Sequence, residues 1–113
     1  MNEKIDYIEF PSTDRAATSD FFTSAFGWSM ISYGPQYDAL EGAGIDGGID
    51  AAPARAVAPL AIVRTQDLDD AERRVVAAGG VITREQFDFP GGRRFHFREP
   101  GGNEMAVWCA TDA

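Results

Sequence analysis

RRFHFREPGGNEMAVW, residues 93–108, is the stretch that decides the fold. Two runs in which apolar and polar residues alternate, 94–98 and 104–108, flank a connector of Glu, Pro, Gly and Asn. Alternation with a period of two on both sides of such a connector predicts a β-hairpin.

The alternation also assigns each side chain of the hairpin to a face, because residues i and i+2 of a strand share one. One face is apolar and is expected to pack against helices: Phe95, Phe97, Met105, Val107 and Cys109. The opposite face is mixed: Arg94, His96, Arg98, Ala106 and Trp108. A face that only contacts water has no need of a tryptophan. We therefore interpret the mixed face as the lining of a cavity.

The rest of the chain repeats one order of elements twice. The first unit, residues 5–51, has a strand at 7–10, a helix beginning near Asp14 with Ser12 or Thr13 as its cap, and short strands at 28–33, 36–41 and 46–51. The aromatic and alanine stripe of this helix is expected to cover the sheet. Residues 52–59 have the composition of a linker.

The second unit, residues 60–109, begins the pattern again. It has a strand at 60–64, a helix at 67–78, a strand at 81–85, a loop at 87–92 and then the closing hairpin. The two βαβββ units predict an α+β protein with a curved eight-stranded mixed sheet and helices on its convex face. We expect one domain spanning residues 1–113, with a concave pocket for a small ligand.

Composition limits the function. Hydrophobic content of 44% and charged content of 25% are typical of a soluble globular protein. The net charge of -8 argues against nucleic acid as a partner and is compatible with a cationic ligand. The longest apolar run is too short to span a membrane, and a single cysteine favours a reducing cytoplasm.

The turn and last strand of the hairpin, EPGGNEMAVW, resemble the closing hairpin of the vicinal oxygen chelate superfamily, the glyoxalase/bleomycin resistance/dioxygenase group. In that group an acidic-Pro-x-Gly-Asn turn leads into a short strand. The segment STDRAA at 12–17, followed by FF at 21–22 and FGW at 26–28, resembles the first helix of the family. DLD at 67–69 and AGG at 78–80 resemble the second. The order is most similar to that of small lactoylglutathione-lyase-related proteins.

The resemblance implies four positions at which many relatives hold a divalent metal, usually through His and Glu. By spacing these positions fall on Tyr7, Gly48, Leu60 and Ala106. Three of these side chains have no donor atom, and one tyrosine oxygen cannot hold a metal alone. We therefore expect no metal and no other cofactor.

The candidate site residues lie on the predicted concave face. His96 is the candidate acid or base because its unperturbed pKa lies near neutrality, and Glu9 or Asp38 is its candidate carboxylate partner. A histidine that only hydrogen-bonds a neighbour is the alternative. The candidate ligand-binding residues are Tyr7, Asp38, Asp50, Leu60, Ile62, Arg94 and Trp108.

Two functional classes follow. The first is a metal-independent protein that binds a small molecule of unknown identity, in the way that the resemblance to bleomycin-resistance proteins implies for an aromatic or cationic compound. The second is a metal-free lyase or isomerase-type enzyme that uses His96 with a pocket carboxylate for proton transfer. In either class the exposed strand edges of a short curved sheet favour a homodimer.

Overall fold

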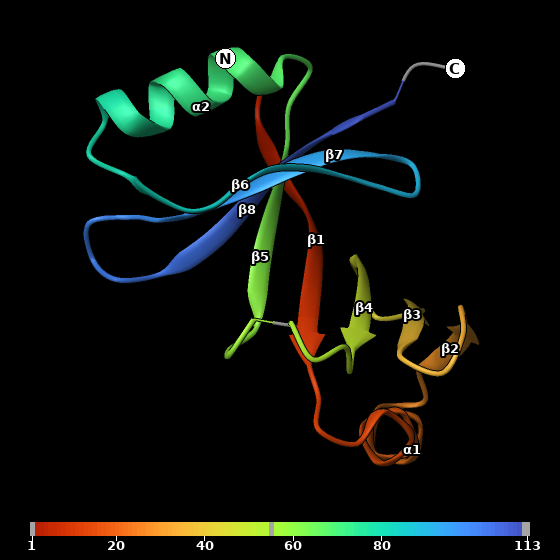
Figure 1. Cartoon of the computed structure of the whole chain (residues 1–113). Helices are drawn as coiled ribbons and strands as arrows, with labels where there is room; N and C mark the ends of the chain where they lie inside the picture. The colour runs from red at the N-terminus through yellow and green to blue at the C-terminus, as the bar shows by residue number, and fades with distance from the viewer. Residues whose placement is uncertain (1, 55, 112–113) are drawn as a thin grey trace. The chain divides into compact units, whose positions relative to one another are not determined.

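The computed structural model describes residues 2–54 and 56–111. It confirms the α+β class: eight strands form one mixed sheet in the order β2-β3-β4-β1-β5-β8-β7-β6, and two helices accompany it (Figure 1). The sheet is not closed, so β2 and β6 are its edge strands. The elements are β1 (Lys4–Pro11), α1 (Arg15–Phe26), β2 (Ser29–Ser32), β3 (Tyr37–Glu41), β4 (Asp46–Asp50), β5 (Leu60–Arg64), α2 (Leu68–Ala77), β6 (Val81–Phe89), β7 (Gly92–Arg98) and β8 (Glu104–Ala110).

The chain divides into two compact units. We call Tyr7–Leu60 the N-terminal unit, and Ala61–Ala113 together with Met1–Asp6 the C-terminal unit. Each unit has one helix and its own set of paired strands. The predicted linker at 52–59 connects β4 to β5, and its residue 55 lies outside the described residues.

In the N-terminal unit, β1 pairs with β4 in parallel, and β3 pairs antiparallel with both β4 and β2. The helix α1 is capped by Asp14, whose carboxylate accepts a hydrogen bond from the amide of Ala17 at 3.1 Å. The predicted caps, Ser12 and Thr13, were therefore wrong. The reason is a local turn, in which the Ser12 hydroxyl accepts from the Asp14 amide at 3.0 Å and so places Asp14 at the cap.

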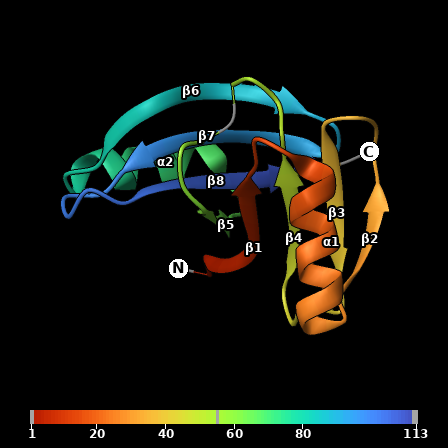
Figure 2. The same ribbon diagram turned by 90° about the horizontal axis from the view of Figure 1, so that it is seen from below.

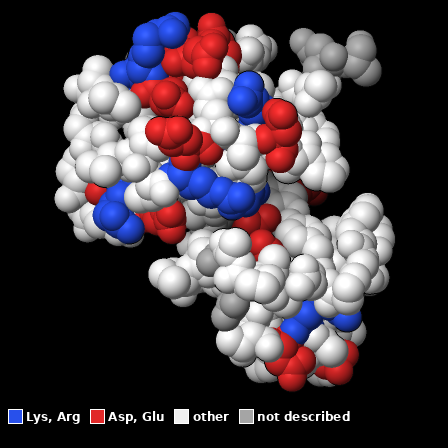
Figure 3. All heavy atoms as spheres, viewed as in Figure 1, with Lys and Arg blue, Asp and Glu red and all other residues white. Residues whose placement is uncertain are grey.

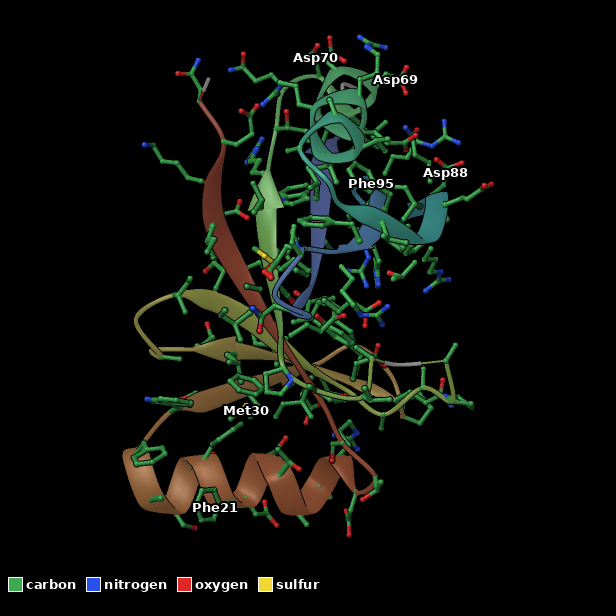
Figure 4. All side chains as sticks on the ribbon, turned by 90° about the vertical axis from the view of Figure 1, so that its left-hand side faces the viewer. Phe21, Met30, Asp69, Asp70, Asp88 and Phe95 are labelled. Carbon is green, nitrogen blue, oxygen red and sulfur yellow. The ribbon has the colours of Figure 1, made fainter. Side chains whose placement is uncertain are left out.

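The aromatic stripe of α1 covers the sheet only in part, which corrects the expectation from its periodicity. Phe22 contacts Phe10 and Trp28, with ring centroids 5.4 and 5.0 Å away. Phe21 and Phe26, however, are 60% and 59% exposed. In Figure 4, Phe21 lies on the outer side of α1. This helix therefore presents large apolar side chains to its surroundings.

The C-terminal unit contains a continuous hydrophobic core between α2 and its strands. Figure 2 shows β6, β7 and β8 side by side with α2 against one face. Phe95 is completely buried and lies between helix and sheet in Figure 4. The orientation predicted for the closing hairpin is thereby confirmed. The buried members of this core are Leu68, Ala71, Phe95, Phe97 and Val107, with Met105 and Cys109 packed against them.

Charged side chains connect α2 to the residue that precedes β1, Glu3. Asp67 caps the helix by accepting from the Asp70 amide at 3.0 Å. Arg74 then bonds to Asp70 at 2.9 Å and to Glu3 at 3.1 Å. Acidic and basic side chains are interspersed over this face of the unit in Figure 3. The Arg74 guanidinium, and after it the Thr65 hydroxyl, hold the pKa of Glu3 at about 2.

The prediction of a loop at 87–92 was wrong for most of that segment. The strand β6 continues to Phe89, and β7 begins at Gly92, so only two residues connect them. Gly91 in this connection has φ 102, a left-handed conformation that glycine adopts without strain. Neither helix in the described part of the chain is long and apolar enough to cross a membrane.

Candidate functional site

Three side chains of the N-terminal unit form a hydrogen-bonded cluster on the sheet face opposite α1. The hydroxyl of Tyr37 donates to Glu9 Oε2 at 3.1 Å and also bonds to the hydroxyl of Tyr7. A phenol has one proton to donate. Since Tyr37 gives its proton to Glu9, Tyr7 is the donor to Tyr37. The cluster is thus a directed chain that ends at a carboxylate.

A glycine makes this cluster possible. Tyr37 starts on β3 and reaches β1 by crossing β4 above Gly48, which pairs with Glu9 on one side and with Ala39 on the other. A Cβ atom on Gly48 would overlap the Tyr37 hydroxyl and lie 2.6 Å from its Cε1. Burial raises the pKa of Tyr37 strongly, and the neighbouring Glu9 carboxylate raises it further. Tyr37 is therefore a neutral hydrogen-bonding group at physiological pH.

The two aspartates predicted for this face lie differently. Asp50 alternates with Gly48 along β4, and its carboxylate accepts from the amide of Ala52 at 2.9 Å. Asp38 was expected beside Tyr7 and Glu9, but this placement was wrong. Its carboxylate is 3% exposed and faces α1, where it accepts from Arg15 at 2.6 Å and from Ser19 at 2.6 Å. In its place, Tyr37 is on the face with Glu9.

In the C-terminal unit, the sheet face opposite α2 carries two rows of side chains that run across four strands. The strand registers place opposing residues side by side on one face. The first row consists of Arg84, His96, Ala106 and Ile62. The second row consists of Phe87, Arg94, Trp108 and Arg64.

The predicted alternation placed Arg94, His96, Trp108 and Ile62 on this face, but it did not predict the contribution of β6. Two register shifts occur in β6, between Ile82 and Arg84 and between Arg84 and Phe87. Because of the second shift, Arg84 and Phe87 share a face although they are three residues apart. Strict alternation would have separated them. The run of Phe87 and Phe89 was the available signal, and it was interpreted as part of a loop.

His96 is 6% exposed and lies beside an aromatic ring and a carboxylate. Its ring centroid is 5.6 Å from that of Phe87. Its Nδ1 is 3.9 Å from Glu104 Oε2, which also accepts from the Thr83 hydroxyl at 2.8 Å. Glu104 was not among the predicted partners of His96. The pairing of His96 with Glu9 stays a prediction.

Trp108 is held in a fixed orientation. Its indole Nε1 donates to Asp6 Oδ1 at 3.0 Å, and the guanidinium carbon of Arg64 lies 4.8 Å from its ring centroid. Its ring is also 6.0 Å from that of Phe89. The indole therefore has a satisfied polar end and an aromatic surface in contact with cations and rings.

The four positions that the family resemblance relates to metal binding do not fit a metal ion. Gly48, Leu60 and Ala106 have no donor atom, and the space above Gly48 contains the Tyr37 hydroxyl. Leu60 is 1% exposed and Ala106 completely buried. Among residues 2–54 and 56–111 there is also no group of three or more His, Cys, Asp or Glu side chains arranged to hold one.

The fold and this site define a class: a small α+β protein of two βαβββ units whose helix-free sheet faces carry polar and aromatic side chains. A model of the Glyoxalase/Bleomycin resistance protein/Dioxygenase superfamily matches residues 4–107. The chain therefore belongs to this superfamily. A search of curated proteins finds no match.

Solved structures show the same fold at low sequence identity. A hypothetical protein from Bacillus halodurans C-125 has a TM-score of 0.80 at 9% identity, with 100% of this chain and 98% of that chain covered. A superfamily member from Vibrio splendidus 12B01 has a TM-score of 0.69 at 14% identity, covering 97% and 100%. Methylmalonyl-CoA epimerase from Mycobacterium tuberculosis has a TM-score of 0.70 at 14% identity, covering 96% and 88%.

Proposed function

We propose that this protein binds a small molecule without a metal ion. The observation that supports the proposal is the Tyr37 hydroxyl above Gly48, hydrogen-bonded to Tyr7 and Glu9. At the two positions of the N-terminal unit that correspond to metal ligands, one residue has no side chain and the other is engaged in this cluster. A neutral phenol with a raised pKa is a poor metal ligand but a good hydrogen-bonding group for a ligand.

Elemental analysis of protein purified without an affinity tag tests metal independence. We expect less than stoichiometric zinc, nickel, iron and manganese, and no change of melting temperature when these ions are added. A stoichiometric metal that raises the melting temperature would contradict the proposal. A thermal-shift screen of metabolites and antibiotics then tests binding, since a ligand that binds only the folded state raises the melting temperature. A screen in which no compound stabilises the protein argues against a binding function.

A second function, proton-transfer catalysis, is favoured by the contact between His96 and Glu104 at 3.9 Å. A carboxylate next to an imidazole favours its charged form and orients the ring. We propose His96 as the acid or base, with Glu104 or Glu9 as the carboxylate. Hits from the screen are incubated in deuterium oxide with wild-type protein and with H96Q. Exchange of a carbon-bound proton that H96Q abolishes supports catalysis, and unchanged exchange excludes His96.

We further propose that the protein is a homodimer in the cytoplasm. The exposed Phe21 and Phe26 on α1 support self-association, because contiguous exposed aromatic side chains mark interaction surfaces. Light scattering tests this against the chain mass of 12.3 kDa. We expect twice that mass for the wild type and a monomer for F21S/F26S. The matched control is V76S, which changes an apolar side chain on α2 that is 54% exposed. A wild-type mass near 12.3 kDa would contradict the proposed homodimer.

A further inference from the structure

Six of the described arginines can be divided into two groups by the partners they have. Arg15, Arg73, Arg74 and Arg93 each form an ion pair with an aspartate or glutamate. Two arginines of the C-terminal unit, Arg64 and Arg84, form no ion pair with any residue in the described ranges 2–54 and 56–111. Each instead lies against an aromatic ring.

The guanidinium carbon of Arg84 lies 3.6 Å from the ring centroid of Phe87, and that of Arg64 lies 4.8 Å from that of Trp108. The guanidinium of Arg94 adds a third contact, 5.3 Å from Phe87 and 5.6 Å from Phe89. A guanidinium that contacts a ring through its flat face keeps the N–H groups at its edge available for hydrogen bonds. The rings therefore position the N–H groups of Arg64 and Arg84 without occupying them.

Two carboxylates beside this face already accept hydrogen bonds from other side chains. Glu104 accepts from Thr83, and Asp6 accepts from the indole of Trp108. In a chain with 18 acidic and 10 basic residues, the guanidiniums of Arg64 and Arg84 would be expected to pair with carboxylates first. Arg64 and Arg84 instead contact aromatic rings, so this face combines guanidinium groups with aromatic side chains.

We propose that the face of the C-terminal unit opposite α2 binds a planar aromatic anion, that is, an aryl ring bearing a carboxylate or phosphate group. The ligand ring stacks against Trp108 and Phe87, and the guanidinium edges of Arg64 and Arg84 receive its anionic group. This assignment rests on the proposed small-molecule binding and names its ligand class. It replaces the aromatic cation that the overall acidity of the sequence suggested.

The dimensions of the face set the size of the ligand. Phe87 and Trp108 lie in one row, separated by the strand β7. Neighbouring strands are about 4.8 Å apart, so the backbones that carry the two rings are separated by about 10 Å along the row. A ligand with two fused rings bridges this interval, with its anionic group at the Arg64 end or the Arg84 end.

Three probes with the same naphthyl ring test the charge preference: naphthoate, which is anionic, neutral naphthamide and cationic naphthylmethylammonium. Each is titrated by calorimetry into the wild type, R64Q, R84Q and R73Q. R73Q is the matched control, because it also removes one arginine, but from an exposed position on α2 where the partner is Asp70. Circular dichroism establishes that all variants are folded. A parallel titration with naphthyl phosphate distinguishes a phosphate from a carboxylate preference.

We expect naphthoate or naphthyl phosphate to bind the wild type more tightly than naphthamide does, and naphthylmethylammonium to bind most weakly. R64Q and R84Q should each weaken anion binding roughly fivefold, because each removes one partly exposed charge contact. Their affinity for neutral naphthamide should equal that of R73Q. Equal binding of all probes, tighter binding of the cation, or an equal effect of R73Q overturns the proposal. If no naphthyl probe binds while the metabolite screen gives other ligands, the aromatic-anion class fails and small-molecule binding stands.

Discussion

Replacing Gly48 by alanine tests the central contact of the N-terminal unit. Gly48 is not among the glycines with positive φ, so its backbone conformation is accessible to alanine. If the space above Gly48 were open, the substitution would stabilise the protein by about 0.4–1 kcal/mol, because alanine restricts the unfolded chain. The structure predicts the opposite sign, since the new Cβ would lie 2.6 Å from Cε1 of Tyr37.

The magnitude follows from the groups that must move. Overpacking of this kind costs about 1–3 kcal/mol. A displaced Tyr37 would also weaken its hydrogen bonds to Tyr7 and Glu9, each contributing about 1 kcal/mol. After the unfolded-state gain is subtracted, we expect G48A to lower the free energy of unfolding by about 2 kcal/mol. In a domain of this size that corresponds to a melting temperature about 8 °C lower.

Urea denaturation of the wild type, G48A, Y37A and G48A/Y37A separates the clash from other effects of the substitution. In the Y37A background the side chain that collides is absent, so G48A should be neutral or slightly stabilising. The difference between the two backgrounds is the coupling free energy, which we expect to be about 2–3 kcal/mol. A stabilising G48A in the wild-type background, or a coupling near zero, would refute the placement of Tyr37 over Gly48.

Three further predictions concern other contacts. R15M should lower the free energy of unfolding by about 2 kcal/mol in chemical denaturation, because it leaves the Asp38 carboxylate buried without its cation. Adding D38N to R15M should partly restore stability, and equal stability of R15M and the wild type would contradict this prediction. Because the pKa of Glu3 is lowered to about 2 from 4.5 by Arg74, its stabilising contribution is complete above about pH 4.5 and is lost as the pH falls toward 2. Urea titrations between pH 5 and pH 2 should therefore show a smaller loss of stability for E3Q than for the wild type, and parallel losses would exclude the contact. F95A should destabilise the C-terminal unit by about 3–5 kcal/mol, measured by thermal unfolding, because Phe95 is completely buried, and a cost below 1 kcal/mol would place this ring outside the core.

The faces of the closing hairpin could be predicted because a single buried face imposes a period of two on both strands. Phe95 and Val107 oppose each other in the register, and both pack beneath α2. A shift by one residue would have exposed both. The same reasoning failed for β3, where Asp38 occupies the helix-facing position that an apolar residue usually takes. Its partner Arg15 is 23 residues away, and a pairing over that separation leaves no periodic signal in the sequence.

The contribution of β6 could not be predicted for a different reason. A bulge is a property of two paired strands, since it counts residues on one strand against residues on the other. The sequence around Arg84 and Phe87 alternates poorly, and without the pairing to β7 it cannot show that both side chains lie on one face. Two of the residues in the proposed ligand face were missed for this reason.

The two units have the same order of elements, and both have a small residue at one corresponding position. Gly48 on β4 and Ala106 on β8 occupy corresponding places, 58 residues apart, and both are among the smallest side chains. Above Gly48 the phenol of Tyr37 crosses from the neighbouring strand. Ala106 opposes His96 on the neighbouring strand and is completely buried despite its size, so other side chains must cover it. In each unit a position that corresponds to a metal ligand in relatives is therefore a small residue beneath larger neighbours. Those neighbours are phenolic and acidic in the N-terminal unit and cationic and aromatic in the C-terminal unit. Since the topology is shared, this difference in side-chain chemistry is what would determine the specificity for the proposed ligand.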